Sequence, residues 1–185
     1  SAELGDPEAQ FFLGVMLTKG QGVALDIPKA KNWFSKAAKD GLPAARFNLA
    51  ILLLREPNVK GNKIRALNLL KKADKQNYKM ATFQLATEYL KNTENDEYQN
   101  KAFNLMRKLA KTGHARAQMQ LGLLYFFGNG TNLNSEEGYF WLRESAMQNF
   151  PPAQHNLGAI YAQGLKSEPN LALAYAWLKI ASTSI

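Results

Sequence analysis

Small and apolar residues recur every 36 positions along the whole chain, with no insertion or deletion. One column holds only alanine, a second column four residues later holds only leucine, and the position after each leucine is small (Ala9, Ala45, Ala81, Ala117, Ala153; Leu13, Leu49, Leu85, Leu121, Leu157; Gly14, Ala50, Ala86, Gly122, Gly158). A period of this length is typical of repeat proteins, in which each copy packs on its neighbours. We therefore expect a single solenoid over 1–185, with copies at about 5–40, 41–76, 77–112, 113–148 and 149–185.

Each copy contains two runs of apolar positions with helical spacing. In the first copy, Ala9 and Leu13 lie four residues apart in one run, and Ala30, Trp33 and Ala37 follow the i, i+3, i+7 pattern in the next. The pattern predicts an all-α fold with two amphipathic helices per copy, which we call helix A and helix B. We expect the column of large residues on helix B to be largely buried between helices (Trp33, Leu69, Leu105, Trp141, Trp177).

The ends of these helices are marked by residues that cap helices. Asp6-Pro7-Glu8 predicts the start of the first helix A. The starts of helices B are predicted at a column of Asp and Asn side chains, in which Tyr98 is the exception and the nearby Asp96 substitutes (Asp26, Asn62, Asn134, Asn170). Gly20 and Gly128 are typical of a left-handed residue that ends a helix.

Composition excludes several classes of chemistry. The chain has no Cys and two His far apart, so neither a thiol nucleophile, a zinc site nor a histidine-based catalytic centre is expected, and we predict no catalytic residue, metal or cofactor. No apolar stretch approaches the roughly 18 residues of a membrane span, and we expect a soluble protein. The net charge is +8, and residues 41–112 hold the whole excess, with 14 basic and 6 acidic residues.

The first copy resembles a complete unit of the Sel-one-like repeat (SLR) family, a relative of the tetratricopeptide repeat. The resemblance rests on 9–14 (AQFFLG), the Gly20-Gln21-Gly22 turn, Asp26 and 33–41 (WFSKAAKDG), and the fourth and fifth copies match well. Copies two and three lack the glycine pair and the tryptophan. The resemblance implies a right-handed α/α superhelical solenoid of antiparallel helix pairs, and a non-catalytic adaptor or scaffold of bacterial or eukaryotic complexes.

The first residues, Ala2-Glu3-Leu4-Gly5, align with the end of helix B in the next copy, 38–41. No polar capping helix follows the last copy, although solenoid ends normally need one. We therefore expect the chain to be a piece of a longer protein. The compartment stays open between bacterial cell envelope, periplasm and cytoplasm, and so does the oligomeric state.

In the related tetratricopeptide fold, helix A lines a concave groove. By this resemblance, apolar columns and a neighbouring basic column on helices A are candidates for binding an amphipathic or acidic peptide or helix (Phe11, Phe47, Ile51, Arg55, Phe83, Lys91, Met119, Phe126, Phe127). The alternative is that these side chains pack against neighbouring helices.

The basic excess gathers mainly on helices B of the second and third copies, with Lys71, Lys72, Lys75 and Lys108 as candidates. A solvated face explains such lysines. Contact with an acidic partner or an anionic envelope polymer is the functional alternative, and nucleic acid is disfavoured because no aromatic residues interleave the lysines. A further alternative is an envelope factor that binds peptidoglycan or polysaccharide. Such a factor would expose Trp and Tyr on the groove, whereas the tryptophans here occupy packing columns.

Overall fold

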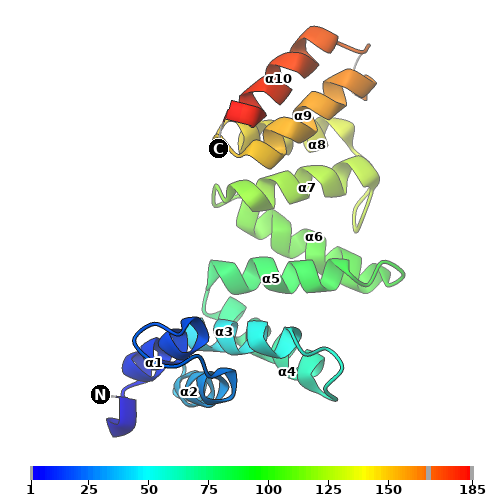
Figure 1. Ribbon diagram of the computed structural model, residues 1–185. Coiled ribbons are helices and arrows are strands. Elements are labelled where there is room, and N and C mark those ends of the chain that lie inside the picture. Colours follow the sequence, from blue (N-terminus) through cyan, green and yellow to red (C-terminus); the bar gives the residue numbers. More distant parts are fainter. Residues whose placement is uncertain (1, 166–167, 184–185) are drawn as a thin grey trace. The chain divides into compact units, whose positions relative to one another are not determined.

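The computed structural model describes residues 2–165 and 168–183, and within these ranges the regular structure is entirely helical (Figure 1). A short 3₁₀ helix, η1 (Ala2–Leu4), comes first. The α-helices follow as A/B pairs: α1 (Pro7–Lys19) and α2 (Ile27–Lys39), α3 (Pro43–Leu54) and α4 (Asn62–Lys75), α5 (Lys79–Leu90) and α6 (Asp96–Ala110), α7 (Ala115–Phe127) and α8 (Ser135–Ala146), α9 (Pro151–Gln163) and α10 (Leu171–Thr183). The all-α class and the helix pairs predicted from the periodicity are confirmed.

The helices form two compact units, Ser1–Leu85 and Ala86–Ile185, which we call the N-terminal unit and the C-terminal unit. Within the N-terminal unit, α1 contacts α2, α2 contacts α3, and α3 contacts α4. Within the C-terminal unit the same order holds from α6 to α10. Within each unit, these helices therefore pack mainly against their neighbours in the chain, as expected for repeats.

Most predicted helix starts and stops are confirmed. Asp6 accepts a hydrogen bond from the Glu8 amide at 3.1 Å, and Asp26 and Asn134 accept bonds from amides in the first turns of α2 and α8. Gly20 and Gly128 end α1 and α7 with φ of 66° and 67°, a left-handed conformation that glycine adopts without strain. Local sequence therefore determines these boundaries.

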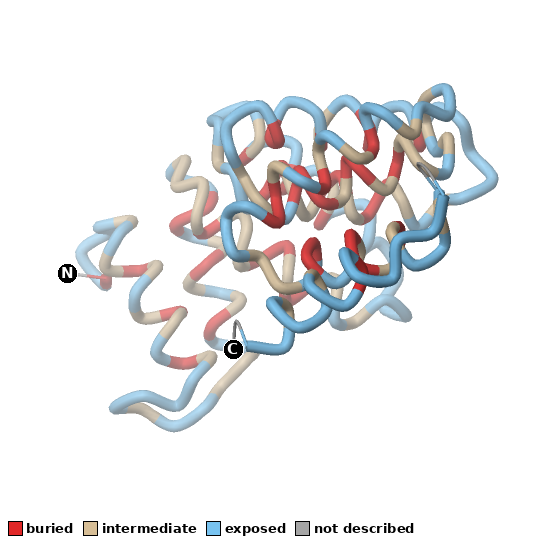
Figure 2. Tube along the Cα trace, turned by 90° about the horizontal axis from the view of Figure 1, so that it is seen from above, coloured by how far each residue is buried: buried red, intermediate tan, exposed pale blue. Residues whose placement is uncertain are grey.

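Small residues form the closest contacts between paired helices. The alanine column is fully buried from Ala45 onward, and buried positions recur on the sides of helices that face one another (Figure 2). A Cβ added at Gly122 would lie 2.8 Å from the carbonyl oxygen of Gly138 on α8, closer than real Cβ atoms come. Glycine at this position therefore allows α7 and α8 to approach within backbone contact.

The tryptophans are partly buried, but they are not the most deeply buried residues of helix B. Trp33, Trp141 and Trp177 are half-buried, whereas the residue that follows the first two is buried almost completely: Phe34 is 1% exposed and Leu142 is 0% exposed. The reason is the close approach at glycine: a Cβ on Gly122 would meet the side chain of Leu142, and one on Gly14 would meet the ring of Phe34. The column one residue later therefore faces helix A, and the tryptophans lie beside it.

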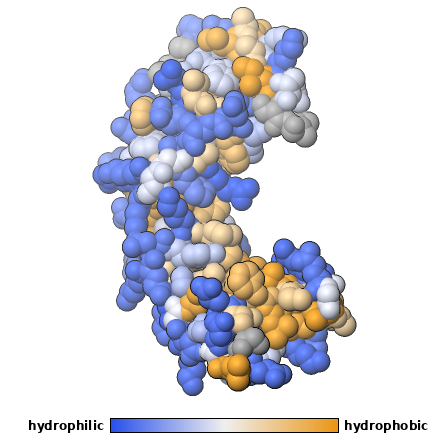
Figure 3. All heavy atoms as spheres, turned by 90° about the vertical axis from the view of Figure 1, so that its left-hand side faces the viewer, coloured by the Kyte–Doolittle hydropathy of each residue, from blue (hydrophilic) through white to orange (hydrophobic). Residues whose placement is uncertain are grey.

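On the face seen in Figure 3, hydrophilic side chains cover much of the surface, and apolar side chains are exposed at several places. Large apolar residues that are at least half exposed include several loop and helix-end positions (Leu4, Phe12, Leu25, Val59, Ile64, Met80, Phe127, Leu133, Met147, Leu165, Leu171, Tyr175). Those that gather around one concavity are candidates for binding.

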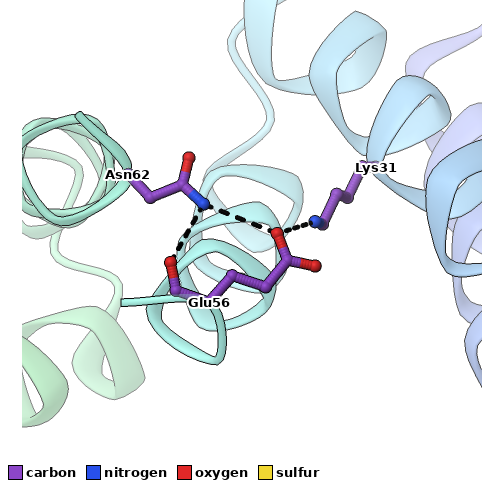
Figure 4. Close-up of polar contacts among 3 residues, drawn as sticks. All are labelled: Lys31, Glu56 and Asn62. Atoms are coloured by element: carbon purple, nitrogen blue, oxygen red, sulfur yellow. Dashed lines mark hydrogen bonds and ion pairs between the residues drawn. The ribbon is translucent and has the colours of Figure 1, made fainter. Parts of the chain in front are cut away.

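Helix B of the second copy begins differently from the prediction. Asn62 is the first residue of α4, the capping position belongs to Gly61, and no side chain caps the helix. The side-chain Nδ2 of Asn62 instead donates to the backbone oxygen of Glu56 at 3.3 Å, and the Glu56 carboxylate also accepts from Lys31 Nζ at 2.5 Å (Figure 4). The glycine-pair turn is missing in this copy, and the Glu56 contacts close the loop in its place.

In the third copy, the residue that caps helix B lies one position before the predicted one. Asn95 caps α6 by accepting from the amide of Tyr98 at 3.0 Å, whereas Asp96 lies in the first turn of the helix. An acidic residue in a first turn still stabilises a helix through the helix dipole.

Candidate binding site

The groove candidates of the N-terminal unit are four half-buried apolar residues and one exposed cation. The Phe11 ring lies 5.8 Å from that of Phe34, and the Phe47 ring lies 5.7 Å from that of Tyr78. These two phenylalanines, with Ile51 and Phe83, are half-buried, and Arg55 is exposed directly after α3. The Phe11 ring thus packs against α2 and the Phe47 ring against the segment between α4 and α5, while both stay partly exposed.

Two groove candidates of the C-terminal unit make contacts within that unit. Met119 is only 9% exposed and belongs to the core formed with Leu142 and Leu157, so its side chain does not form a binding surface. Lys91 pairs with Glu88 at 2.6 Å, and the Glu88 side chain is 4% exposed. The positive charge of Lys91 therefore balances a buried carboxylate on its own helix.

The remaining two candidates, Phe126 and Phe127, line a concavity between α7, α9 and the segment before α8. Its volume is about 420 Å³, and we call it the α7–α9 pocket. Apolar side chains form most of the wall, and three polar residues complete it (Leu123, Phe126, Phe127, Leu133, Ile160, Leu165, with Ala159; Ser135, Asn156, Gln163). An apolar concavity with a few polar groups is the usual form of a ligand site.

Three large side chains of the α7–α9 pocket are strongly exposed. Phe127 is 70%, Leu133 66% and Leu165 52% exposed. Three exposed apolar residues around one hollow leave a hydrophobic surface in water, and a bound apolar side chain would cover it. Phe126 is half-buried and also packs against the core of the unit, so it joins the pocket to the rigid interior.

Helix ends position the exposed members of the α7–α9 pocket. Gly128 ends α7 in the left-handed conformation, and the chain turns until the Asn134 amide donates to the carbonyl oxygen of Tyr125 at 2.9 Å. This return brings Leu133 back beside α7. Gly164 ends α9 in the same way, with φ of 66°, directly before Leu165.

The sequence prediction missed Leu133, Ile160 and Leu165, because it considered only columns on helix A that face the expected groove. A signal for Leu133 was present: Leu25 occupies the same position after the glycine-pair turn of the first copy, and it is 64% exposed. A leucine retained after this turn although it is exposed indicates a role other than core packing.

A tyrosine pair joins α8 to α9 in the same unit. The hydroxyl groups of Tyr139 and Tyr161 lie 2.5 Å apart, and their rings meet edge to face at 6.1 Å. Burial, and next the hydrogen bond with Tyr139, raise the pKa of Tyr161 to about 12. The Tyr161 hydroxyl is therefore neutral at physiological pH, and its contact with Tyr139 stabilises the packing of α8 on α9.

The candidate basic residues Lys71, Lys72 and Lys75 are exposed on α4, and Lys108 is exposed on α6. Lys72 differs from its neighbours because it lines a hollow between helices. His114, which sequence analysis assigned no chemical role, caps α7 by accepting from the amide of Ala117 at 3.2 Å.

Within the described ranges, no three His, Asp or Glu side chains lie close enough together to hold a metal ion. None of the helices in these ranges is both long enough and apolar enough to cross a lipid bilayer. Among the described residues that line the α7–α9 pocket, the polar groups are the Ser135 hydroxyl and the side-chain amides of Asn156 and Gln163.

The Sel1 repeat model matches the chain five times, at residues 7–42, 43–78, 79–114, 115–150 and 151–184. The chain belongs to the Sel1 repeat family. Sel1 repeat proteins are generally scaffolds for protein–protein interaction, and their fold is typically non-catalytic. The resemblance seen in the sequence is confirmed, and with it the solenoid fold class.

Solved bacterial structures share this fold. The chain is 33% identical to c5321, a protective antigen of uropathogenic Escherichia coli with an SLR fold, at a TM-score of 0.89 over 99% of this chain and 39% of that one. It is 31% identical to a Sel1 repeat protein of Oxalobacter formigenes, at a TM-score of 0.84 over 100% of this chain and 76% of that one. This Sel1 repeat chain thus spans well under half the length of the E. coli antigen.

A more distant structure, the immunity protein PA5088 of Pseudomonas aeruginosa, is 22% identical at a TM-score of 0.59, over 96% of this chain and 65% of that one, and shares the fold alone. None of the curated proteins matches the chain significantly.

Proposed function

We propose that this Sel1 repeat chain is a non-catalytic scaffold that captures an amphipathic segment of a partner protein, and that the α7–α9 pocket receives the apolar side chains of that segment. The observation that carries the proposal is the arrangement of Phe127, Leu133 and Leu165 around one apolar hollow. The family supports the partner class, because Sel1 repeats generally bind proteins.

The size and lining of the pocket favour a peptide segment as the ligand. A volume of about 420 Å³ accepts a few apolar side chains. Ser135, Asn156 and Gln163 can hydrogen-bond to the polar side or the backbone of the same segment. Peptides that place apolar side chains in a groove and keep their polar face in water are a common class of ligand.

The half-buried rings of the N-terminal unit are proposed as weaker contributors. Phe11, Phe47, Phe83 and Ile51 expose only part of their surface, and Arg55 offers an exposed charge. Binding energy is usually concentrated in a few aromatic anchors. We therefore expect Phe127 to contribute more to affinity than any of these four apolar residues.

The test is selection of peptides from a displayed library on the immobilised chain, followed by affinity measurements with purified variants. Phe127→Ala should weaken binding of the selected peptides roughly tenfold, the loss expected for an exposed aromatic anchor. The matched control is Phe140→Ala, because Phe140 is also exposed, at 47%, and lies on α8 outside the pocket. Selection of peptides without apolar residues, or equal affinity for the parent chain and Phe127→Ala, would refute the proposal.

A further inference from the structure

Two adjoining hollows lie on the N-terminal unit, a smaller one between α2, α3 and α4 and a larger one along α4. The smaller, of about 180 Å³, is lined by four cations, one hydroxyl and three apolar side chains (Lys39, Arg46, Arg65, Lys72; Ser35; Ala38, Leu49, Leu69). The larger, of about 420 Å³, shares Arg65, Leu69 and Lys72 with the first and adds Ile64 and Asn68. We call the two hollows together the basic pocket.

Positive charge in the basic pocket is not balanced by acidic residues. No Asp or Glu lines either hollow, and in the described part of the chain none of these four cations forms an ion pair. The acidic side chains Asp26 and Glu56 of this unit pair with Lys29 and Lys31 instead. Four like charges around one small hollow repel each other, and an anion bound among them would remove that repulsion.

The two guanidinium groups of the basic pocket are held in place by protein atoms. Arg46 donates from Nε to the carbonyl oxygen of Ala38 at 3.1 Å and from Nη1 to the side-chain oxygen of Gln76. Arg65 donates from Nη2 to the Ser35 hydroxyl at 3.4 Å. Each guanidinium has five N–H donors, so several stay available to a ligand. A fixed guanidinium binds a carboxylate with a smaller loss of entropy than a mobile one.

We propose that the basic pocket binds an acidic segment of a partner protein, in which carboxylates contact Arg46, Arg65, Lys39 and Lys72 while a neighbouring aliphatic side chain covers Leu69 and Ile64. The apolar part of the pocket argues for this ligand, because Ile64 is 69% exposed beside the cations. A free phosphate would leave that surface uncovered. Nucleic acid is disfavoured because no aromatic ring lines either hollow, and single strands bind largely by stacking of bases on aromatic rings.

The test uses a fluorescent peptide in which one leucine is flanked on each side by two glutamates, with anisotropy measured at low and high salt. The peptide should bind the intact chain at low salt, and the same peptide with glutamines should not. The double variant Arg65→Gln with Lys72→Gln should weaken binding roughly tenfold, because two charge-assisted contacts are lost. Its thermal stability should stay the same or rise, since the repulsion decreases.

The matched control is Lys71→Gln with Lys75→Gln, which removes the same charge from the same helix outside the basic pocket. This control should lower affinity by less than about twofold, since exposed charges act mainly through screened long-range attraction. Equal losses in both double variants would show binding to the whole basic face and would overturn the proposal. Binding of the glutamine peptide, or displacement by inorganic phosphate or a single-stranded oligonucleotide more readily than by unlabelled peptide, would also overturn it. The pocket lies in the N-terminal unit, so its test is separate from that of the α7–α9 pocket.

Discussion

At the scale of single residues, the contrast between adjacent positions on helix B is the clearest result. Trp141 is half-buried and its indole nitrogen donates to Glu137 Oε2 at 3.0 Å on the exposed side of α8. Leu142 is 0% exposed and lies against Gly122. The smaller side chain therefore contributes more to the core than the larger one, because it faces helix A at the point of closest approach.

Replacement of these two residues should show the difference. Leu142→Ala should lower the free energy of unfolding by about 2–5 kcal/mol, the range for loss of a buried leucine. Trp141→Ala should cost less than Leu142→Ala, because water already contacts part of the indole. Chemical denaturation of both variants measures the two values. A larger loss for Trp141→Ala would mean that the tryptophan column is the true core column.

At the scale of secondary-structure elements, the helices are connected by a small set of repeated contacts. In the first, fourth and fifth copies, the capping residue of helix B donates its amide to a carbonyl oxygen in the last turn of helix A, at 3.0, 2.9 and 2.8 Å for Asp26, Asn134 and Asn170. The second copy uses the contacts of Glu56 instead. Different loops thus produce the same antiparallel pair, because the apolar faces of the helices determine how they pack.

The contact between Tyr139 and Tyr161 makes the pairing of α8 and α9 sensitive to alkaline pH. The pKa of Tyr161 is raised from 10.0 to about 12, so the folded chain holds the phenolic proton more tightly than the unfolded chain. This stabilisation is complete below pH 10, and it is lost as pH rises from about 10 towards 12.

The free energy of unfolding should therefore fall between these pH values, and Tyr161→Phe should flatten part of that fall. Tyr175→Phe is the control, since the Tyr175 ring is 67% exposed, and it should leave the pH dependence as in the parent chain. Denaturant unfolding at a series of alkaline pH values provides the measurement. An identical pH dependence for Tyr161→Phe and Tyr175→Phe would contradict the assignment.

At the scale of the whole molecule, contacts within each unit connect helices that are consecutive in the chain. In such an arrangement, stability is approximately a sum of terms from each helix pair and its neighbours. Damage at one place should then remain local, because few contacts carry it to distant repeats.

Amide hydrogen exchange can test this locality. Leu142→Ala should accelerate exchange in α7, α8 and α9 while α1 and α2 stay as protected as in the parent chain. Leu70→Ala is the matched variant in the N-terminal unit, since Leu70 is also 0% exposed, and it should give the opposite distribution. Uniform acceleration along the whole chain for either variant would show that the repeats unfold as one cooperative block.

The candidate sites were only partly predictable from the sequence. Phe126 and Phe127 were selected from columns on helix A, and both line the α7–α9 pocket. Met119 belonged to the same set of columns and is buried in the core. Lys72 was selected as one of several lysines, but its partners Lys39, Arg46 and Ser35 come from other helices. A column identifies residues at equivalent positions, whereas a pocket joins residues from non-equivalent ones.

By itself, the sequence determined the repeat, the helix pairs and most of their ends, since the helical period and the caps depend on residues a few positions apart. Only the tertiary structure decided which neighbour on helix B enters the core, because one residue rotates the helix face by about 100° and the facing glycine selects between Trp141 and Leu142. The tertiary structure likewise decided which residues line the two pockets. Leu133 and Leu165 reach α7 and α9 from loops, and the four cations of the basic pocket converge from three helices, so neither grouping has a spacing that the sequence reveals.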